Sequence, residues 1–400
     1  LSSFQENEMT DRAVWFACLL SCCLASSSTV TPPPTTLYND VLKSPPSPPP
    51  SSPFDSFRHD VSQIGSITSP ITSGSKRDSS YSKLWDNADW EEHCAPSLAR
   101  YIRHMLRWPH STTAAYVMPT VLVVSIWSAI VVKVVDVYPN LLGSLGGGSG
   151  ALGISLAPIL LLLTLKTNRS MDRLLEARKT WGLMTRALRS LMGLCCTYLL
   201  PFDETNGGSS ATDCTLLIGR YLSIFPWVLK GTLRAEDDEE LIRRVLPPNE
   251  AEWVLNSPAK RPSAIVVRIR NLIAQQLKEQ EQKSSQPSTV LTIGHLQMEE
   301  RLCDLETSFG RCYRIYTSPI PPTYTRHTSR VLFLHLLLLP LGLVGATSVS
   351  PLLLILTCAL TSYVLVGIDE IGLEVEHAFP MMPLQPLAKR IQGEILNQVI

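Results

Sequence analysis

The sequence predicts an all-α, multi-pass membrane protein whose four transmembrane helices extend into a helical bundle on the cytoplasmic or stromal side. Three observations support this class. The chain of 400 residues is 45% hydrophobic and only 18% charged, whereas soluble domains carry about 25% charged residues. Four apolar runs stand out over a window of transmembrane length. Between the second and third runs, apolar residues recur at steps of three and four, which is the period of an α-helix.

Composition also excludes some functions. The chain has 35 Lys and Arg against 35 Asp and Glu, and a nucleic-acid-binding protein usually has a basic excess, so we expect no nucleic-acid partner. The ten cysteines have neither the paired spacing of a zinc site nor the pattern of a disulfide framework. We expect them to be small buried apolar residues, and we predict no cofactor.

Residues 1–80 predict a leader followed by a disordered linker. The sequence does not begin with Met, and Met9 could be the true start. The apolar stretch 13–25 has the order of a signal peptide, but it is too short to span a bilayer. Residues 26–80 are rich in Pro, Ser and Thr, a composition that cannot bury a core. This part is therefore either an organelle-targeting leader or an uncleaved, poorly ordered tail.

Residues 81–400 contain the four apolar runs. The first covers about 114–135, with Lys133 near its end, where a long side chain can reach the interface. The second, 152–165, is short for a transmembrane helix and follows a glycine-rich segment. Because of its length, this run fits a span lined by protein or water better than one that faces lipid on all sides.

The third and fourth runs, about 331–346 and 351–368, are separated by a few residues and predict a helical hairpin. Residues 317–330, which precede the third run, contain three prolines. We expect this segment to form a rigid, non-helical turn that is buried in protein.

The positions of the basic residues predict the orientation. Residues 166–330 hold 23 of the 35 Lys and Arg residues, whereas the loops 139–150 and 347–350 hold none. The positive-inside rule therefore places the middle segment on the cytoplasmic or stromal side. We expect this segment to form a soluble helical bundle that extends the spans.

Three sequence blocks stand at fixed places relative to the spans. They are Thr167-Asn168-Arg169-Ser170-Met171-Asp172-Arg173 after the second run, Thr317-Ser318-Pro319-Ile320-Pro321-Pro322 before the third, and Gly367-Ile368-Asp369-Glu370-Ile371-Gly372 after the fourth. In this order they resemble the bestrophin family, and within it the bacterial and plastid branch. The upstream Trp85-Asp86-Asn87-Ala88-Asp89-Trp90 also resembles that branch, so the likeness covers about 81–400.

The resemblance implies a homopentameric, passive anion channel that conducts chloride and related monovalent anions, sometimes bicarbonate, with the second span lining the pore. It also implies that the helical segments at about 166–330 and 369–400 form a vestibule below the spans. By register with the Thr167 block, the pore neck falls on Ala157, Leu161 and Leu165. Residues four apart share one face of a helix, so five copies would form stacked apolar rings. The alternative is that this stripe faces lipid or another helix.

Charged residues near the spans have two further predicted roles. Lys166, Arg169 and Arg173 follow the neck and either attract anions or anchor the helix at the interface. A structural lock is predicted between basic residues before the third run and acidic residues after the fourth, because charges near a membrane interface seek partners. The predicted lock residues are Arg326, His327, Arg330, Asp369, Glu370 and Glu374.

Two other functions are open on the sequence alone. Glu370, Glu374 and His377 share one helical face, as in di-iron carboxylate sites, and could serve a membrane-bound, metal-dependent enzyme. Such a site needs a second Glu-x-x-His, which the sequence lacks, so we predict no metal site and no enzyme. The chain could also be a non-conducting membrane scaffold. With a leader and a plastid-type body, we expect a plastid membrane, thylakoid or envelope, with the plasma membrane as the alternative.

Overall fold

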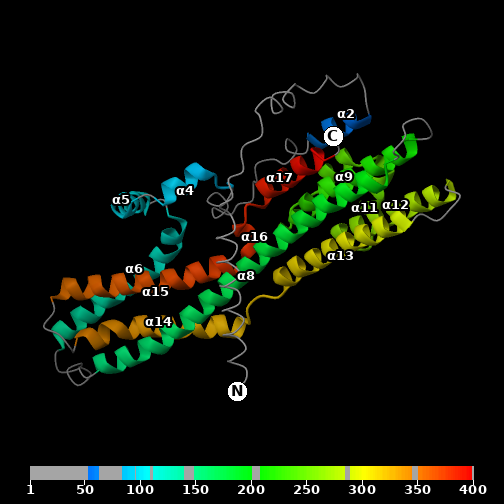
Figure 1. Cartoon of the computed structure of the whole chain (residues 1–400). Helices are drawn as coiled ribbons and strands as arrows, with labels where there is room; N and C mark the ends of the chain where they lie inside the picture. The colour runs from blue at the N-terminus through cyan, green and yellow to red at the C-terminus, as the bar shows by residue number, and fades with distance from the viewer. Residues whose placement is uncertain are drawn as a thin grey trace, which may run out of the picture. The chain divides into compact units, whose positions relative to one another are not determined.

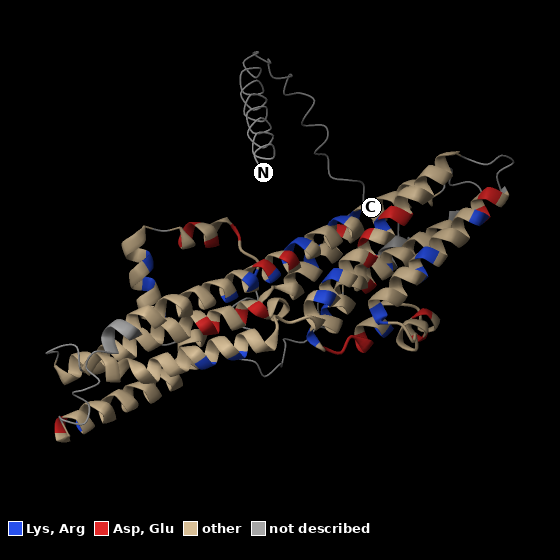
Figure 2. Ribbon diagram, turned by 90° about the horizontal axis from the view of Figure 1, so that it is seen from below, with Lys and Arg blue, Asp and Glu red and all other residues tan. Residues whose placement is uncertain are grey.

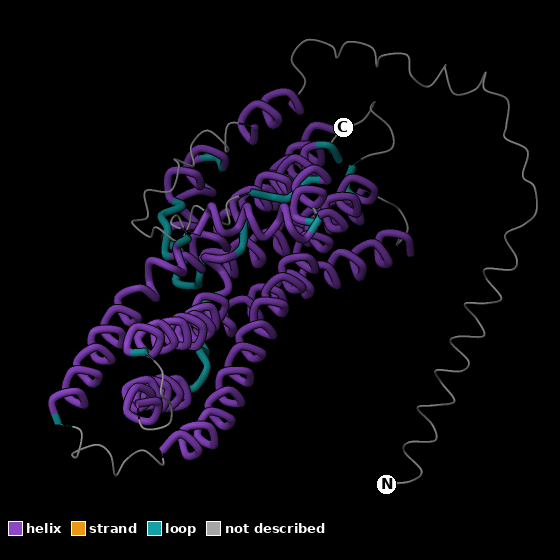
Figure 3. The backbone as a smooth tube through the Cα atoms, turned by 90° about the vertical axis from the view of Figure 1, so that its left-hand side faces the viewer, coloured by secondary structure: helices purple, strands orange, loops and turns teal. Residues whose placement is uncertain are grey.

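The computed structural model describes residues 53–62, 83–94, 96–108, 111–138, 148–200, 208–283, 289–344 and 350–398. The regular secondary structure of these ranges is helical throughout (Figure 3). This agrees with the predicted fold class. Most of the predicted leader and linker, 1–80, lies outside the described residues.

The helices are labelled in Figure 1. They are α2 Pro53–Ser62, α4 Asn87–His93, α5 Ser97–Arg107, α6 Thr112–Val137, α8 Gly148–Tyr198, α9 Gly208–Arg234, α10 Glu239–Val245, α11 Pro248–Leu255, α12 Arg261–Lys283, α13 Thr289–Thr317, α14 Pro322–Val344, α15 Pro351–Glu376, α16 Ala378–Met381 and α17 Leu384–Leu396.

Three helices, α6, α14 and α15, are long and apolar enough to cross a membrane by their length and composition. They pack with the first part of α8 (Figure 1) around a shared apolar core that includes Val121, Leu163, Leu336 and Leu365. The C-terminal ends of α6 and α14 lie at the same end of this bundle as the N-terminal ends of α8 and α15. The two loops without basic residues therefore connect helices at one end, as the predicted orientation requires.

The second predicted span, 152–165, is part of a single helix of 51 residues. Beyond Pro158, α8 contains good helix formers and no further proline. The helix therefore continues from the membrane bundle into the vestibule, and it belongs to the core of both parts.

The turn predicted over 317–330 is wrong for most of that segment, since α14 begins at Pro322 and only four residues separate it from α13. A proline in the first turn of a helix removes no intrahelical hydrogen bond, because the N–H that it lacks would have had no partner there. Tyr324 then lies within α14, and its hydroxyl donates to the carbonyl oxygen of Leu162 on α8 at 2.8 Å.

The predicted vestibule is a helical bundle built on the second part of α8. Helix α13 packs along α8, while α9 contacts both α12 and α17. Its core contains large side chains such as Trp181, Tyr221 and Phe225, all buried. Figure 2 shows that charged residues gather on this part of the chain and are sparse along the apolar spans.

Helix α2 differs from the prediction of a disordered linker. Phe57 and Val61 lie one turn apart and are fully buried in the vestibule core. Asp60 also forms an ion pair with Arg220 of α9 at 2.8 Å. Two buried apolar residues at helical spacing, together with this ion pair, attach the short segment to the bundle.

Candidate pore face on helix α8

The predicted neck residues lie on one face of α8 that the rest of the chain leaves uncovered. Ala157 is exposed, and Leu161 and Leu165 are 60% and 47% exposed. On the other side of the helix, Ile159 and Leu163 are buried in the membrane bundle. The apolar stripe is thus available to lipid, to water or to another copy of the chain, and none of the described helices packs on it.

Arg169 stands four residues after Leu165, so it continues the same helical face toward the vestibule. Its side chain is exposed, as is that of Asn168 beside it. Thr164, one turn before Asn168, is also exposed, but its hydroxyl donates to the carbonyl oxygen of Leu160 at 2.8 Å. The uncovered face of α8 therefore changes from apolar to cationic at Arg169.

Lys166 lies away from this face. Its side chain is 0% exposed, and its Nζ donates to Oδ1 of Asp369 on α15 at 2.5 Å. The hydroxyl of Ser329 on α14 donates to Oδ2 of the same carboxylate at 3.2 Å. One buried cluster therefore joins α8, α14 and α15. A lysine at the end of an apolar helix needs a charged or polar partner, so the sequence indicated that Lys166 is paired. It did not show that Asp369 is the partner.

Arg173 also differs in setting from Arg169. Its guanidinium donates to the carbonyl oxygens of Ser318 at 2.5 Å and Ile315 at 2.7 Å, both next to the loop between α13 and α14. The side chain is partly buried and turned toward that loop. Of the three cations predicted to attract anions, Arg169 alone is exposed on the face that carries Leu161 and Leu165.

The lock between the hairpin and the rest of the chain uses other pairs than predicted. Arg326, His327 and Arg330 are exposed, and the carboxylate of Asp369 pairs with Lys166 of α8 instead. The reason is that α14 is already helical here, which points Ser329 toward Asp369 and leaves the basic residues on outer positions. A second attachment comes from Glu376, whose Oε1 accepts from the backbone N–H of Ile320 at 3.0 Å.

The enzyme alternative gains no geometric support. Among the described residues, no three His, Cys, Asp or Glu side chains come together as a metal site, and this includes Glu370, Glu374 and His377. We therefore do not place a metal on this face of α15.

These features define an all-α, multi-pass membrane protein with one long helix whose apolar face is uncovered. The family model described as Bacterial/Fungal Bestrophin protein matches residues 93–397. The chain belongs to the bestrophin family.

Similar proteins support this assignment. The chain is 25% identical over 331 residues to voltage-dependent chloride channel 1, chloroplastic, of Arabidopsis thaliana, covering 79% of this chain and 73% of that protein. It is 25% identical over 241 residues to a voltage-dependent anion channel-forming protein of Synechocystis sp., covering 59% of this chain and 72% of that protein.

A solved structure gives the same result. The crystal structure of a bacterial bestrophin homologue from Klebsiella pneumoniae is similar, with a TM-score of 0.59 and 26% sequence identity, over 70% of this chain and 98% of that chain. The relatives are thus named as channels and bestrophins rather than as enzymes.

Proposed function

We propose that this chain is a passive anion channel that conducts chloride and related monovalent anions, bicarbonate among them. The relatives that are named as anion and chloride channels support this function. The observation that carries it within the molecule is the apolar stripe of Leu161 and Leu165, which is exposed while Ile159 and Leu163 of the same helix are buried in the bundle. An exposed apolar face on a membrane helix lies against lipid, against another chain or along a pore, and the channel relatives favour the pore.

In the proposed assembly, five copies surround one axis, and Ala157, Leu161 and Leu165 of each copy form the neck. An apolar constriction excludes ions by dewetting and admits weakly hydrated anions more easily than strongly hydrated ones. Arg169 of each copy would then form a cationic ring next to the neck, which raises the local concentration of anions. The metal-dependent enzyme and the non-conducting scaffold are less favoured, because the relatives are named as channels.

The proposed location is a plastid membrane, thylakoid or envelope. Support comes from the chloroplastic names of two similar Arabidopsis thaliana channels, with the plasma membrane as the alternative. The lipid bilayer is a direct partner of the chain, since three helices are apolar enough to cross it.

The test is anion flux in proteoliposomes that contain the purified full chain, together with the mass of the assembly in solution. We expect flux of chloride and an assembly of five chains. Leu161→Ala should change the conductance or the order of permeant anions because it widens the neck. Leu160→Ala is the matched control, since Leu160 is exposed too but lies about 100° around the helix.

Each alternative gives a different result in this assay. A scaffold would assemble without flux, and an enzyme would show metal-dependent turnover without flux. Equal currents in Leu161→Ala and Leu160→Ala would contradict the neck assignment while leaving the channel function intact.

A further inference from the structure

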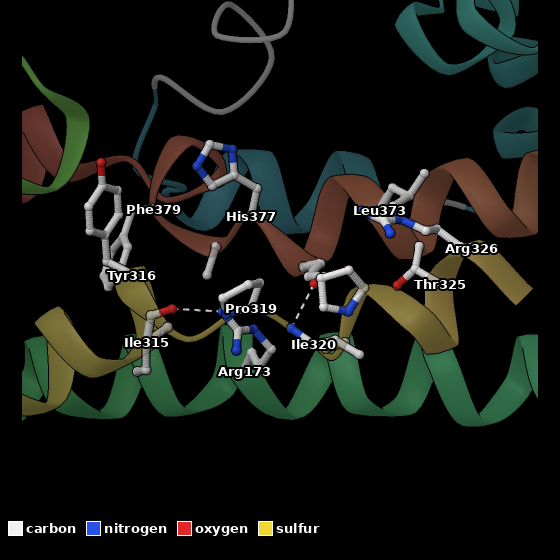
Figure 4. Close-up of a pocket in the computed structure, with 13 residues that line it drawn as sticks. Arg173, Ile315, Tyr316, Pro319, Ile320, Thr325, Arg326, Leu373, His377 and Phe379 are labelled. Atoms are coloured by element: carbon white, nitrogen blue, oxygen red, sulfur yellow. Dashed lines mark hydrogen bonds between the residues drawn. The ribbon is translucent and has the colours of Figure 1, made fainter.

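A cavity of about 430 Å³ lies where α8, the loop before α14 and the C-terminal end of α15 meet (Figure 4). None of the predicted neck residues lines it. Its wall has an apolar part that includes Ile320, Leu373 and Phe379, and a cationic part formed by Arg173 and Arg326. In Figure 4, Arg173 rises from α8 below Pro319, and Arg326 lies beside Leu373.

The positive charge of Arg173 has no carboxylate partner among the described ion pairs. Its two terminal nitrogens donate to backbone carbonyl oxygens, and its Nε is buried without a hydrogen-bond partner in the part of the chain that is described. Glu176, about one turn further along α8, is bound instead to Arg314 at 2.5 Å. Carbonyl dipoles orient the guanidinium but leave its net charge uncompensated.

The cavity has more positive than negative groups. Glu376 is the one carboxylate in its lining, and it also accepts a hydrogen bond from the N–H of Ile320, which fastens the loop. Arg326 is exposed, on the second turn of α14. His377 lines the wall as well and adds a positive charge only when protonated. Two guanidinium groups thus face one carboxylate that already holds a backbone bond.

The depth of the cavity in the membrane narrows the choice of ligand. Helix α14 begins at Pro322 and helix α15 ends at Glu376, and both are candidate spans. The cavity therefore lies at the ends of the spans, on the side of the vestibule, where lipid headgroups are found. Basic pockets between helices at this level suit anionic headgroups, and guanidinium groups match the geometry of phosphate oxygens.

We propose that this cavity binds a phosphate group, supplied by an anionic phospholipid such as phosphatidylglycerol. Arg326 and Arg173 attract the phosphate, and the acyl chain lies against the apolar wall of Ile320 and Leu373. This site is separate from the neck and goes beyond anion conduction. The same cationic groups would also accept free inorganic phosphate, and the apolar wall is the reason to favour the lipid.

The experiment uses the purified full chain in detergent, stripped of lipid, with bound phosphatidylglycerol counted by native mass spectrometry during a titration. Arg326→Gln should weaken binding by about 10-fold or more, as expected for one lost charge-assisted contact. Arg330→Gln is the matched control because it removes the same charge one turn further along α14, is equally exposed, and does not line the cavity. It should bind as the wild type does.

Two further arms identify the source of the phosphate. Phosphatidylcholine, which has no net charge, should bind more weakly than phosphatidylglycerol. Inorganic phosphate that displaces the lipid only from chains with Arg326 would support the proposal, because it shows that the lipid is held by its phosphate group. Binding of inorganic phosphate without binding of phosphatidylglycerol would assign the site to the free anion and overturn the proposal. Equal binding of phosphatidylglycerol by both variants, or no preference over phosphatidylcholine, would overturn the proposal. The readout is binding, so it is independent of whether the chain conducts.

Discussion

Replacing Asp369 with Asn is expected to destabilise the membrane bundle strongly, because it leaves the ammonium group of Lys166 buried without its counter-charge. The side chains of Lys166 and Asp369 are 0% and 10% exposed, and Nζ and Oδ1 are 2.5 Å apart. Asn still accepts from Ser329, so the substitution removes the charge of the acceptor while it keeps the size of the side chain.

The magnitude follows from the geometry. At 2.5 Å the attraction is about 7 kcal/mol with an effective dielectric constant of 20. The desolvation of each ion costs several kcal/mol, so the intact pair contributes little net stability. Breaking such a pair is different, because the remaining charge keeps its desolvation penalty and loses its compensation. We therefore expect Asp369→Asn to lower the free energy of unfolding by about 3–5 kcal/mol.

The assay is thermal unfolding of the purified channel in detergent, followed by tryptophan fluorescence and by the amount of assembled protein. Glu239→Gln is the control, since Glu239 and Arg243 form a pair whose side chains are 45% and 54% exposed, and its loss should cost at most about 0.5 kcal/mol.

A double variant tests whether the unpaired buried charge is the cause of the lost stability. Lys166→Met with Asp369→Leu removes both charges and fills a similar volume, so it should recover most of the stability lost in Asp369→Asn. If the double variant were as unstable as Asp369→Asn, the explanation by an unpaired buried charge would be refuted.

Two more predictions concern the vestibule. Gly294→Ala should destabilise the contact between α13 and α8 by about 1–3 kcal/mol, because a Cβ there would lie 2.7 Å from the ring of Tyr198. Gly310→Ala is the control, because no atom lies near the position of its added Cβ. Equal melting temperatures of the two variants would contradict the packing argument. Hydrogen bonding by the Arg268 guanidinium lowers the pKa of Glu250, so this carboxylate stabilises the fold above its unfolded pKa, about 4.3, and the contribution is lost as the pH falls through the lower folded pKa. The difference in melting temperature between wild type and Glu250→Gln should therefore be largest above about pH 4.3 and should shrink as the pH falls below that value; a difference that stays constant with pH would argue against this stabilisation.

The sequence predicted much of the fold, because its signals are local. Long apolar runs marked α6, α14 and α15, a shorter apolar run marked the start of α8, and helical periodicity marked the predicted vestibule. The boundaries were less certain, as the start of α14 shows: three prolines indicated a turn over 317–330, yet a proline in the first turn is compatible with a helix, so α14 begins at Pro322. The identities of the neck residues came from register with one sequence block and remain a prediction.

By itself, the sequence determined the fold class, the family resemblance and the face of α8 that carries Ala157, Leu161 and Leu165, since each apolar run, each motif block and the helical spacing of these three residues can be recognised within a short stretch of the chain. Only the tertiary structure decided which charges meet. Lys166 and Asp369 are 203 residues apart, and several acids near the end of the fourth run were equally plausible partners. Packing of α8 against α15 selects one of them, because a buried ammonium group is stable only where a carboxylate lies within hydrogen-bonding distance.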